Sequence, residues 1–168
     1  MRTLLALICM LAIGAFSGIS SPAQAQSGML TGEMADSNAL LGGPWNCTTA
    51  VPAMMGQPAH TEKVMLTFEV VPGNVFHDHV SGSMYAGDDY FGYSSKTKTY
   101  WSASADNEGS YGAATSTDGK TYTGTSSMGP VSMSVTSTYG RVSDSKITLH
   151  QIMSGGGQQA TIDSSCTR

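Results

Sequence analysis

The sequence predicts an all-β fold, an antiparallel up-and-down barrel of about ten strands that follows a short N-terminal helix. Two observations carry this prediction. From Asp88 to Tyr139, short runs of Ser, Thr and aromatic residues are interrupted at regular intervals by Asn, Asp, Gly and Pro, as in successive hairpins. Cys47 and Cys166 stand near the first and last predicted strands, which a closed barrel must bring together. A two-sheet β-sandwich remains the alternative.

The N-terminal residues 1–25 have the organisation of a secretory signal peptide. Arg2 gives a basic start, residues 4–19 form an apolar run, and Ala23-Gln24-Ala25 is a small-x-small cleavage site. The run is too short for a membrane span, and no basic stop follows it. We therefore expect residues 26–168 to be exported to the periplasm or the extracellular space, without a membrane anchor.

Two cysteines remain once this segment is removed. In an exported chain an even pair indicates one disulfide, here between Cys47 and Cys166. Two free thiols are the alternative. A bridge that closes so long a loop contributes roughly 4–5 kcal/mol in the chain-entropy treatment, and usually less in practice.

The mature chain begins with an N-terminal segment, residues 26–41, in which Glu33–Leu41 can form a short helix that packs against one end of the fold. The barrel domain is expected over residues 42–168. One face of its first strand carries alternating residues, namely Trp45, Cys47, Thr49 and Val51.

The clearest hairpin turns at Pro72-Gly73-Asn74. Its first strand alternates apolar and polar residues, as expected for a strand with one buried face. If the turn holds three residues, the buried face pairs Val64 with Gly82, Leu66 with Val80 and Phe68 with Asp78. Asp78 is the exception among these residues, because a carboxyl on that face needs a hydrogen-bond partner or access to water.

The same register places Glu69 opposite His77 and Thr67 opposite His79 on the other face. Histidines two residues apart on a strand project together, and a facing carboxylate could complete a zinc or copper site. Glu69, His77 and His79 are therefore candidate metal ligands, expected to bind a divalent metal only weakly if at all. The alternative is a solvated histidine pair with a Glu–His contact. No spacing argument brings His60 or His150 to this site.

The remaining strands supply further inward faces to the predicted barrel. The residues expected to point inward are Trp101 and Ala103 on one strand, Val131, Met133 and Val135 on another, and Ile147, Leu149 and Met153 on a third. Residues 158–166 form the closing strand. The strands between Gly109 and Gly124 place mainly small residues against these side chains, which predicts unfilled space inside the barrel.

Charge and motifs exclude several classes of function. The formal net charge is −4 and becomes −5 when Arg2 is removed, with no long run of one sign, so we expect no nucleic-acid partner. No Gly-x-Ser-x-Gly, His-Glu-x-x-His, P-loop or Rossmann glycine motif is present, and no enzymatic activity is expected. Asp88 and Asp89 are expected in a solvated turn. We also expect a monomer.

Two stretches resemble known barrel families. Gly43-Pro44-Trp45 is similar to the Gly-x-Trp opening of lipocalin-type barrels, and residues 90–125 are similar to the repeated Gly-Tyr and Gly-Lys-x-Tyr pattern of a bacterial family of uncharacterised exported proteins. The resemblance implies a lipocalin-like or nitrobindin-like barrel of unassigned activity. Haem, which such barrels can hold, needs an inward histidine, whereas His150 alternates with the more apolar face, so we expect no cofactor.

Two function classes follow from these observations. The first is a binding barrel that holds a small apolar molecule against Phe68, Trp101, Met133, Val135 and Leu149. The second is a structural or interaction protein whose barrel is filled by its own side chains, with Tyr111, Tyr122 and the N-terminal helix as the plug.

Overall fold

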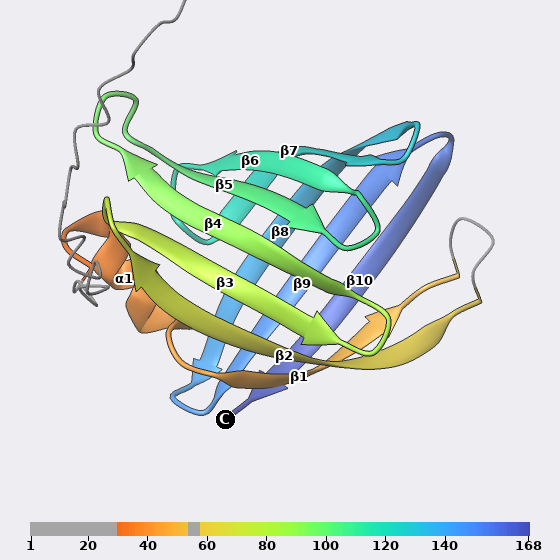
Figure 1. Ribbon diagram of the computed structural model, residues 1–168, viewed down its shortest axis with the longest axis horizontal. Helices are drawn as coiled ribbons and strands as arrows, with labels where there is room; N and C mark the ends of the chain where they lie inside the picture. Colours follow the sequence, from red (N-terminus) through yellow and green to blue (C-terminus); the bar gives the residue numbers. More distant parts are fainter. Residues whose placement is uncertain (1–29, 54–57) are drawn as a thin grey trace, which may run out of the picture.

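The computed structural model describes residues 30–53 and 58–168, and the predicted signal peptide lies outside these residues. Ten strands form one closed antiparallel barrel (Figure 1), which confirms the predicted fold class and excludes the sandwich. The helix α1 (Glu33–Leu41) has the predicted bounds. Among the described residues, no helix has the length and apolar character that a bilayer crossing requires.

The strands follow one another around the barrel in chain order. They are β1 (Trp45–Val51), β2 (His60–Val71), β3 (Val75–Gly82), β4 (Ala86–Ser94), β5 (Thr99–Asp106), β6 (Tyr111–Ser116), β7 (Thr121–Met128), β8 (Val131–Ser143), β9 (Lys146–Gly155) and β10 (Gln158–Thr167).

The β2–β3 hairpin has the predicted register. Phe68 pairs with Asp78 and Glu69 with His77. Residues of the turn supply the backbone conformations that a tight reversal needs, since Gly73 has φ 95° and Asn74 has φ 59°. Because side chains alternate across a strand, this register fixes which residues of β2 and β3 face the barrel interior.

The barrel closes where β1 pairs with β10. Cys47 and Cys166 are directly opposite each other in this ladder and form a disulfide with an S–S distance of 2.01 Å. This confirms the predicted bridge. The disulfide lies inside the barrel, where the sulfur-bearing side chains are 3% and 1% exposed.

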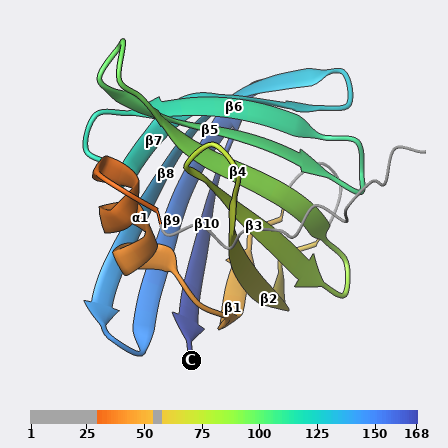
Figure 2. The same cartoon turned by 60° about the vertical axis from the view of Figure 1, so that its left-hand side comes forward.

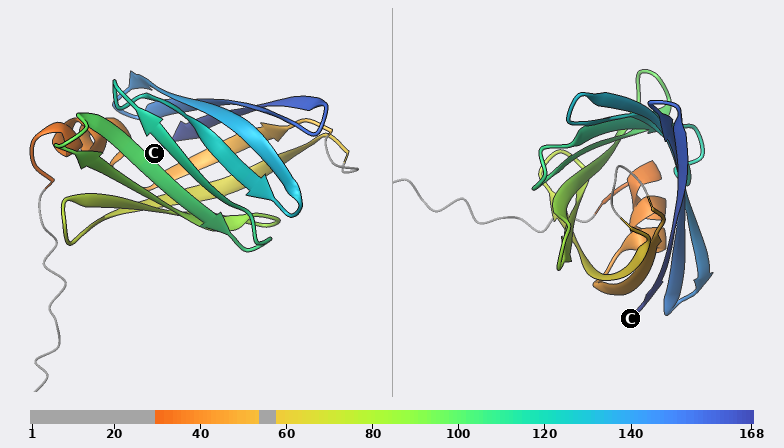
Figure 3. Two further views of the ribbon diagram at one scale, coloured as in Figure 1. Left: turned by 90° about the horizontal axis from the view of Figure 1, so that it is seen from above. Right: turned by 90° about the vertical axis from the view of Figure 1, so that its right-hand side faces the viewer.

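The helix α1 closes one end of the barrel, as Figures 2 and 3 show. Its side chains Met34 and Leu41 are fully buried in the hydrophobic core. Trp45 fixes the junction between helix and barrel, because its indole Nε1 donates a hydrogen bond of 2.7 Å to the Leu41 carbonyl. A second anchor comes from the β2–β3 turn, where the Asn74 side chain bonds both the N–H and the carbonyl of Thr31.

Aromatic rings fill the barrel next to α1. Phe76 packs on Phe68 with ring centroids 4.8 Å apart, and Phe91 makes edge contacts with Tyr122 and Tyr139. This cluster joins the buried residues of α1 in one core. The helix end of the barrel is therefore self-filled, with Tyr122 and α1 in the predicted plugging role, whereas Tyr111 is exposed.

Candidate functional site

The inner surface of the barrel, here called the lumen, is defined by strand register. Phe76, whose side chain is in the core, pairs with Phe91, and Asp78 two residues later pairs with Asp89. Alternation then places Ser104 on the same face, because Ser104 pairs with Asp89. The lumen wall of β3, β4 and β5 thus changes from aromatic beside α1 to acidic and polar further along.

Four of the five predicted ligand-contacting residues face the lumen. Phe68 pairs with Asp78 on β3, Val135 pairs with Met153 on β9, and Leu149 pairs with Tyr139 on β8. Met133 lies on the same face as Val135 and is buried. These four side chains share the inner face of the barrel.

Trp101 is the exception, since it lies on the outer face of the barrel. Its neighbour Tyr100 pairs with Tyr93, and both pack against the core, so alternation turns Trp101 outward, with Ala103 on the same face. The indole lies over Gly92, the residue opposite it on β4, where an added Cβ would overlap the ring. The glycine gives the large ring a place outside the barrel, and Trp101 cannot line the lumen.

Part of the lumen surface remains accessible to solvent. Phe68, Val135 and Leu149 face inward, yet each keeps intermediate exposure. Tyr139, which packs against the core, has the same intermediate exposure. These inward-facing side chains are therefore not fully covered by the residues around them.

Two carboxyl groups face this part of the lumen. Asp78 is 5% exposed, and its Oδ1 has no hydrogen-bond partner among the described residues. Burial, together with the charge of Asp89, raises the pKa of Asp78 to about 8. Burial and the charge of Asp88 raise the pKa of Asp89 to about 6. The paired acids therefore compete for ionisation in a site that does not stabilise their charge.

Two tyrosine hydroxyls lie in the electrostatic field of these acids. Burial and then the charges of Asp89 and other nearby carboxylates raise the pKa of Tyr85. The pKa of Tyr139 is raised by burial and by Asp89 and Asp78. Both phenols stay neutral at physiological pH and can donate hydrogen bonds into the lumen.

The other inward acids near the open end are already engaged. Glu62 accepts hydrogen bonds of 2.7 and 3.2 Å from the N–H groups of Met84 and Tyr85, which stabilise the β3–β4 connection. Asp106 accepts bonds from the N–H groups of its own turn, including one of 2.8 Å from Ser110. Asp78 differs from both, because its buried Oδ1 has no donor in the described part of the chain.

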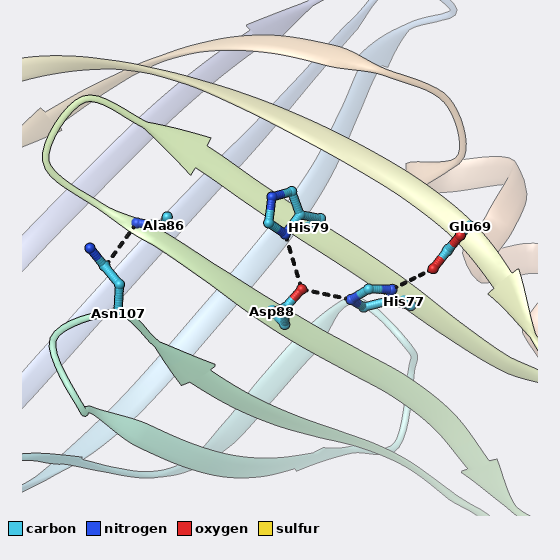
Figure 4. A network of polar contacts seen from close by, with 6 residues as sticks. All are labelled: Glu69, His77, His79, Ala86, Asp88 and Asn107. Carbon is cyan, nitrogen blue, oxygen red and sulfur yellow. Dashed lines mark hydrogen bonds and ion pairs between the residues drawn. The ribbon is translucent and has the colours of Figure 1, made fainter.

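The outer face of the same strands carries a histidine–carboxylate network, shown in Figure 4. His77 Nδ1 is 2.8 Å from Glu69 Oε1, and His77 Nε2 is 2.8 Å from Asp88 Oδ1. His79 Nδ1 is 3.0 Å from the same Asp88 oxygen. The ring of Tyr90 stacks on His77 with centroids 4.5 Å apart.

This network favours a proton over a metal on His77. A carboxylate only accepts hydrogen bonds, so both ring nitrogens of His77 must donate, which they do together only in the imidazolium form. Burial alone lowers the pKa of His77, but the bonds to Glu69 and Asp88 outweigh it and the net pKa is raised. A protonated histidine has no lone pair for a metal. Among the described residues, no group of three or more His, Cys, Asp or Glu has metal-binding geometry.

The sequence identified part of this arrangement. Asp78 stood out as a carboxyl on an apolar face, and the Glu69–His77 contact followed from the hairpin register. The turn expected at Asp88 and Asp89 was wrong, because both lie within β4; Asp88 is accessible to solvent as expected, whereas Asp89 faces the lumen. The signal that could have placed them is the alternation of Asp89 with Phe91, which needs the β3–β4 register to be read.

A comparison of the sequence with protein-family models finds no match, and a comparison with curated proteins finds none either. The lipocalin-like resemblance is therefore supported only at the level of the closed barrel.

Proposed function

We propose that this protein is an exported, monomeric binding barrel for a small molecule with an apolar body, which occupies the lumen from the end opposite α1. The observation that carries the proposal is that inward-facing Phe68, Val135 and Leu149 keep accessible surface inside a closed barrel. The Cys47–Cys166 disulfide fits an oxidising compartment, in support of export to the periplasm or the extracellular space.

The position of α1 supports entry from one end only. Met34 and Leu41 seal the barrel beside the aromatic cluster, so a ligand on that side would have to displace the core. At the opposite end, the strands are joined by short turns such as those at Gly129 and Gly156. A molecule that enters there meets Val135 and its partner Met153 before it reaches Leu149, which lies beside Tyr139 of the aromatic core.

A binding titration tests the proposal. The probe is N-phenyl-1-naphthylamine, a neutral apolar dye whose fluorescence rises in apolar surroundings, added to the mature chain. We expect saturable binding in the micromolar range, about −8 kcal/mol. Val135→Trp fills the lumen and should weaken binding about tenfold or more. The matched control is Thr138→Trp, an exposed position on the same strand, which should bind as the parent does.

The competing function is a structural or interaction protein with a self-filled barrel. It is favoured by the aromatic cluster and α1, and by a Ser/Thr-lined hollow of about 330 Å³ beside the β6–β7 turn on the outer wall. The carboxylate in that hollow, Asp118, already accepts bonds from Ser116, Lys120 and Thr121. If the dye does not bind saturably, or binds Val135→Trp and Thr138→Trp equally well, the interaction reading replaces the binding barrel.

A further inference from the structure

Two neighbouring acids face the lumen, and the nearest cation, His77, acts against the raised pKa of Asp89 only from the outer face of the barrel. Asp78 and Asp89 are direct cross-strand partners on β3 and β4, and both belong to the inward face. Asp78 is only 5% exposed, and its buried Oδ1 has no hydrogen-bond donor within residues 30–53 and 58–168. A buried carboxylate without a donor or an opposite charge is costly, so something outside the described chain is needed to satisfy it when it is ionised.

The groups that face the pair offer no positive charge at hydrogen-bond distance. Across the strands stand Phe68 on β2 and Ser104 on β5, both uncharged. Tyr85 and Tyr139 contribute neutral phenols, and Glu62 and Asp106 add further negative charge to the lumen.

Two basic residues of the described strands lie on the inward face, His60 and Arg141, and each already has a partner of its own. His60 lies at the start of β2, where its Nδ1 is 3.1 Å from the Pro58 carbonyl. Arg141 lies at the α1 end of β8 and bonds the Ala39 carbonyl and Asp144. Among the described residues, the lumen is therefore acidic without a basic partner.

The surroundings of the pair suit an organic cation better than a bare metal ion. No described group of His, Cys, Asp and Glu has metal-binding geometry, so too few oxygens converge for a metal. An aromatic ring stands beside the carboxyl instead, because Phe68 pairs with Asp78 and keeps accessible surface. Carboxylate and aromatic face together recognise an ammonium group attached to an apolar body.

We propose that the lumen binds a small amine in its protonated form, with the ammonium group held between Asp78 and Asp89 and the apolar body against the inward-facing side chains of β8 and β9. This inference rests on the proposed function and deepens it, since it names the ligand class. The ammonium supplies a donor to the unpartnered Asp78 oxygen and a counter-charge for both acids. A neutral ligand of the same shape leaves the pair unsatisfied and binds more weakly.

Calorimetry with two matched probes tests this inference on the mature chain. The probes are 2-phenylethylamine and 2-phenylethanol, which differ in the charged group and share the apolar body. At about pH 8.5, above the pKa of Asp78, we expect the amine to bind at least about tenfold more tightly than the alcohol. Asp78→Asn should remove this preference and leave alcohol binding unchanged. Asp163→Asn, which alters an exposed acid on the outer face of β10, should keep it.

Every outcome of the comparison is informative. Equal affinity for amine and alcohol, or an amine preference that survives Asp78→Asn, overturns the amine assignment. The dye N-phenyl-1-naphthylamine then separates the two proposals. If the dye binds but the amine is not preferred, the binding barrel stands and only the amine assignment fails. If neither the dye nor the amine binds, the binding barrel is rejected as well. Circular dichroism checks the fold of each variant. If Asp78→Asn does not fold, Asp89→Asn takes its place. The ratio of amine to alcohol affinity in the parent protein tests the inference without any variant.

Discussion

The two faces of strands β3 and β4 show how the same residue type behaves in opposite environments. On the outer face, Asp88 accepts hydrogen bonds from His77 and His79, and these bonds lower its pKa. On the inner face, its chain neighbour Asp89 is held at a raised pKa of about 6 by burial and by the charge of Asp88. One step along a strand therefore reverses the sign of the pKa shift, because it exchanges histidine donors for a closed interior.

The two faces of β3 and β4 neutralise their carboxyl groups in different ways. The outer acids are accessible and share protons with histidines, so the network is neutralised from within. On the inner face, Asp78 Oδ1 has no such partner among the residues that the structure describes. On the outer face, histidines of the protein itself neutralise the carboxylates. On the inner face, the charge of Asp78 is neutralised only by a proton or a bound cation.

The largest expected effect comes from Asp78→Asn on stability against pH. A carboxyl whose folded pKa is raised binds its proton more tightly in the folded state, so its ionisation destabilises the fold as pH rises from the unfolded pKa to the folded one. For Asp78 that window runs from 3.8 to about 8. Urea unfolding should show the variant more stable than the parent by roughly 3–5 kcal/mol at about pH 9, and little changed at about pH 4.

Asp163→Asn is the matched control for this measurement, since Asp163 is exposed on the outer face and bonded to His150. Its stability difference from the parent should be small at either pH. If the unfolding free energy of the parent protein does not decrease from about pH 4 to about pH 9, ionised Asp78 is stabilised by a partner, and the contrast between the two faces is wrong.

A smaller effect is expected from His77→Ala on the outer face. The raised pKa of His77 gives stability that is fully present below pH 6.5 and is lost as pH rises through the folded pKa. The variant should lose roughly 1 kcal/mol at about pH 5.5 and less at about pH 9, because the contacts of His77 with exposed Glu69 and Asp88 are screened by solvent. The measurement is urea unfolding at both pH values, with His150→Ala as the control at another outer-face pair. A loss that is equal at both pH values would assign the role of His77 to packing on Tyr90 instead.

The smallest expected effect is the response of the outer network to zinc. Both nitrogens of His77 are engaged by carboxylates, so zinc must displace a proton and break two hydrogen bonds before it can bind. Calorimetric titration should give a dissociation constant no tighter than about 10 µM. Sub-micromolar binding that disappears in His77→Ala would make the outer face a metal site after all.

The sequence predicted the β2–β3 hairpin in full because local signals agreed there. A three-residue turn fixes the register, and the alternation of Leu66 and Phe68 with polar residues fixes the buried face. The N-terminal helix and the Cys47–Cys166 bridge were also predictable, since the helix depends on a short-range pattern and the bridge on there being two cysteines outside the predicted signal peptide.

Trp101 and Asp89 could not be placed in the same way. Tyr100 and Trp101 are adjacent, so one of two large rings must face outward, and hydrophobicity does not say which. The decision rests on Gly92 across the ladder, which accommodates the indole outside the barrel. Asp89 lies among aromatic and glycine residues on β4, and only its pairing with Asp78 reveals that both acids share the interior. Contacts between strands decided both cases.

The seam between β1 and β10 has a consequence for how the ring assembles. Every other ladder joins strands that follow one another in the chain, whereas Cys47 and Cys166 are separated by 119 residues. The nine ladders between consecutive strands can form by local pairing. The β1–β10 pairing must overcome the entropy cost of closing a loop that contains nearly the whole barrel. Until it does, β1 and β10 are unpaired edges, the kind that invite strand exchange between copies. The disulfide forms only once β1 and β10 have met, and it then keeps the two strands together, so any later opening of the seam closes again as a local event.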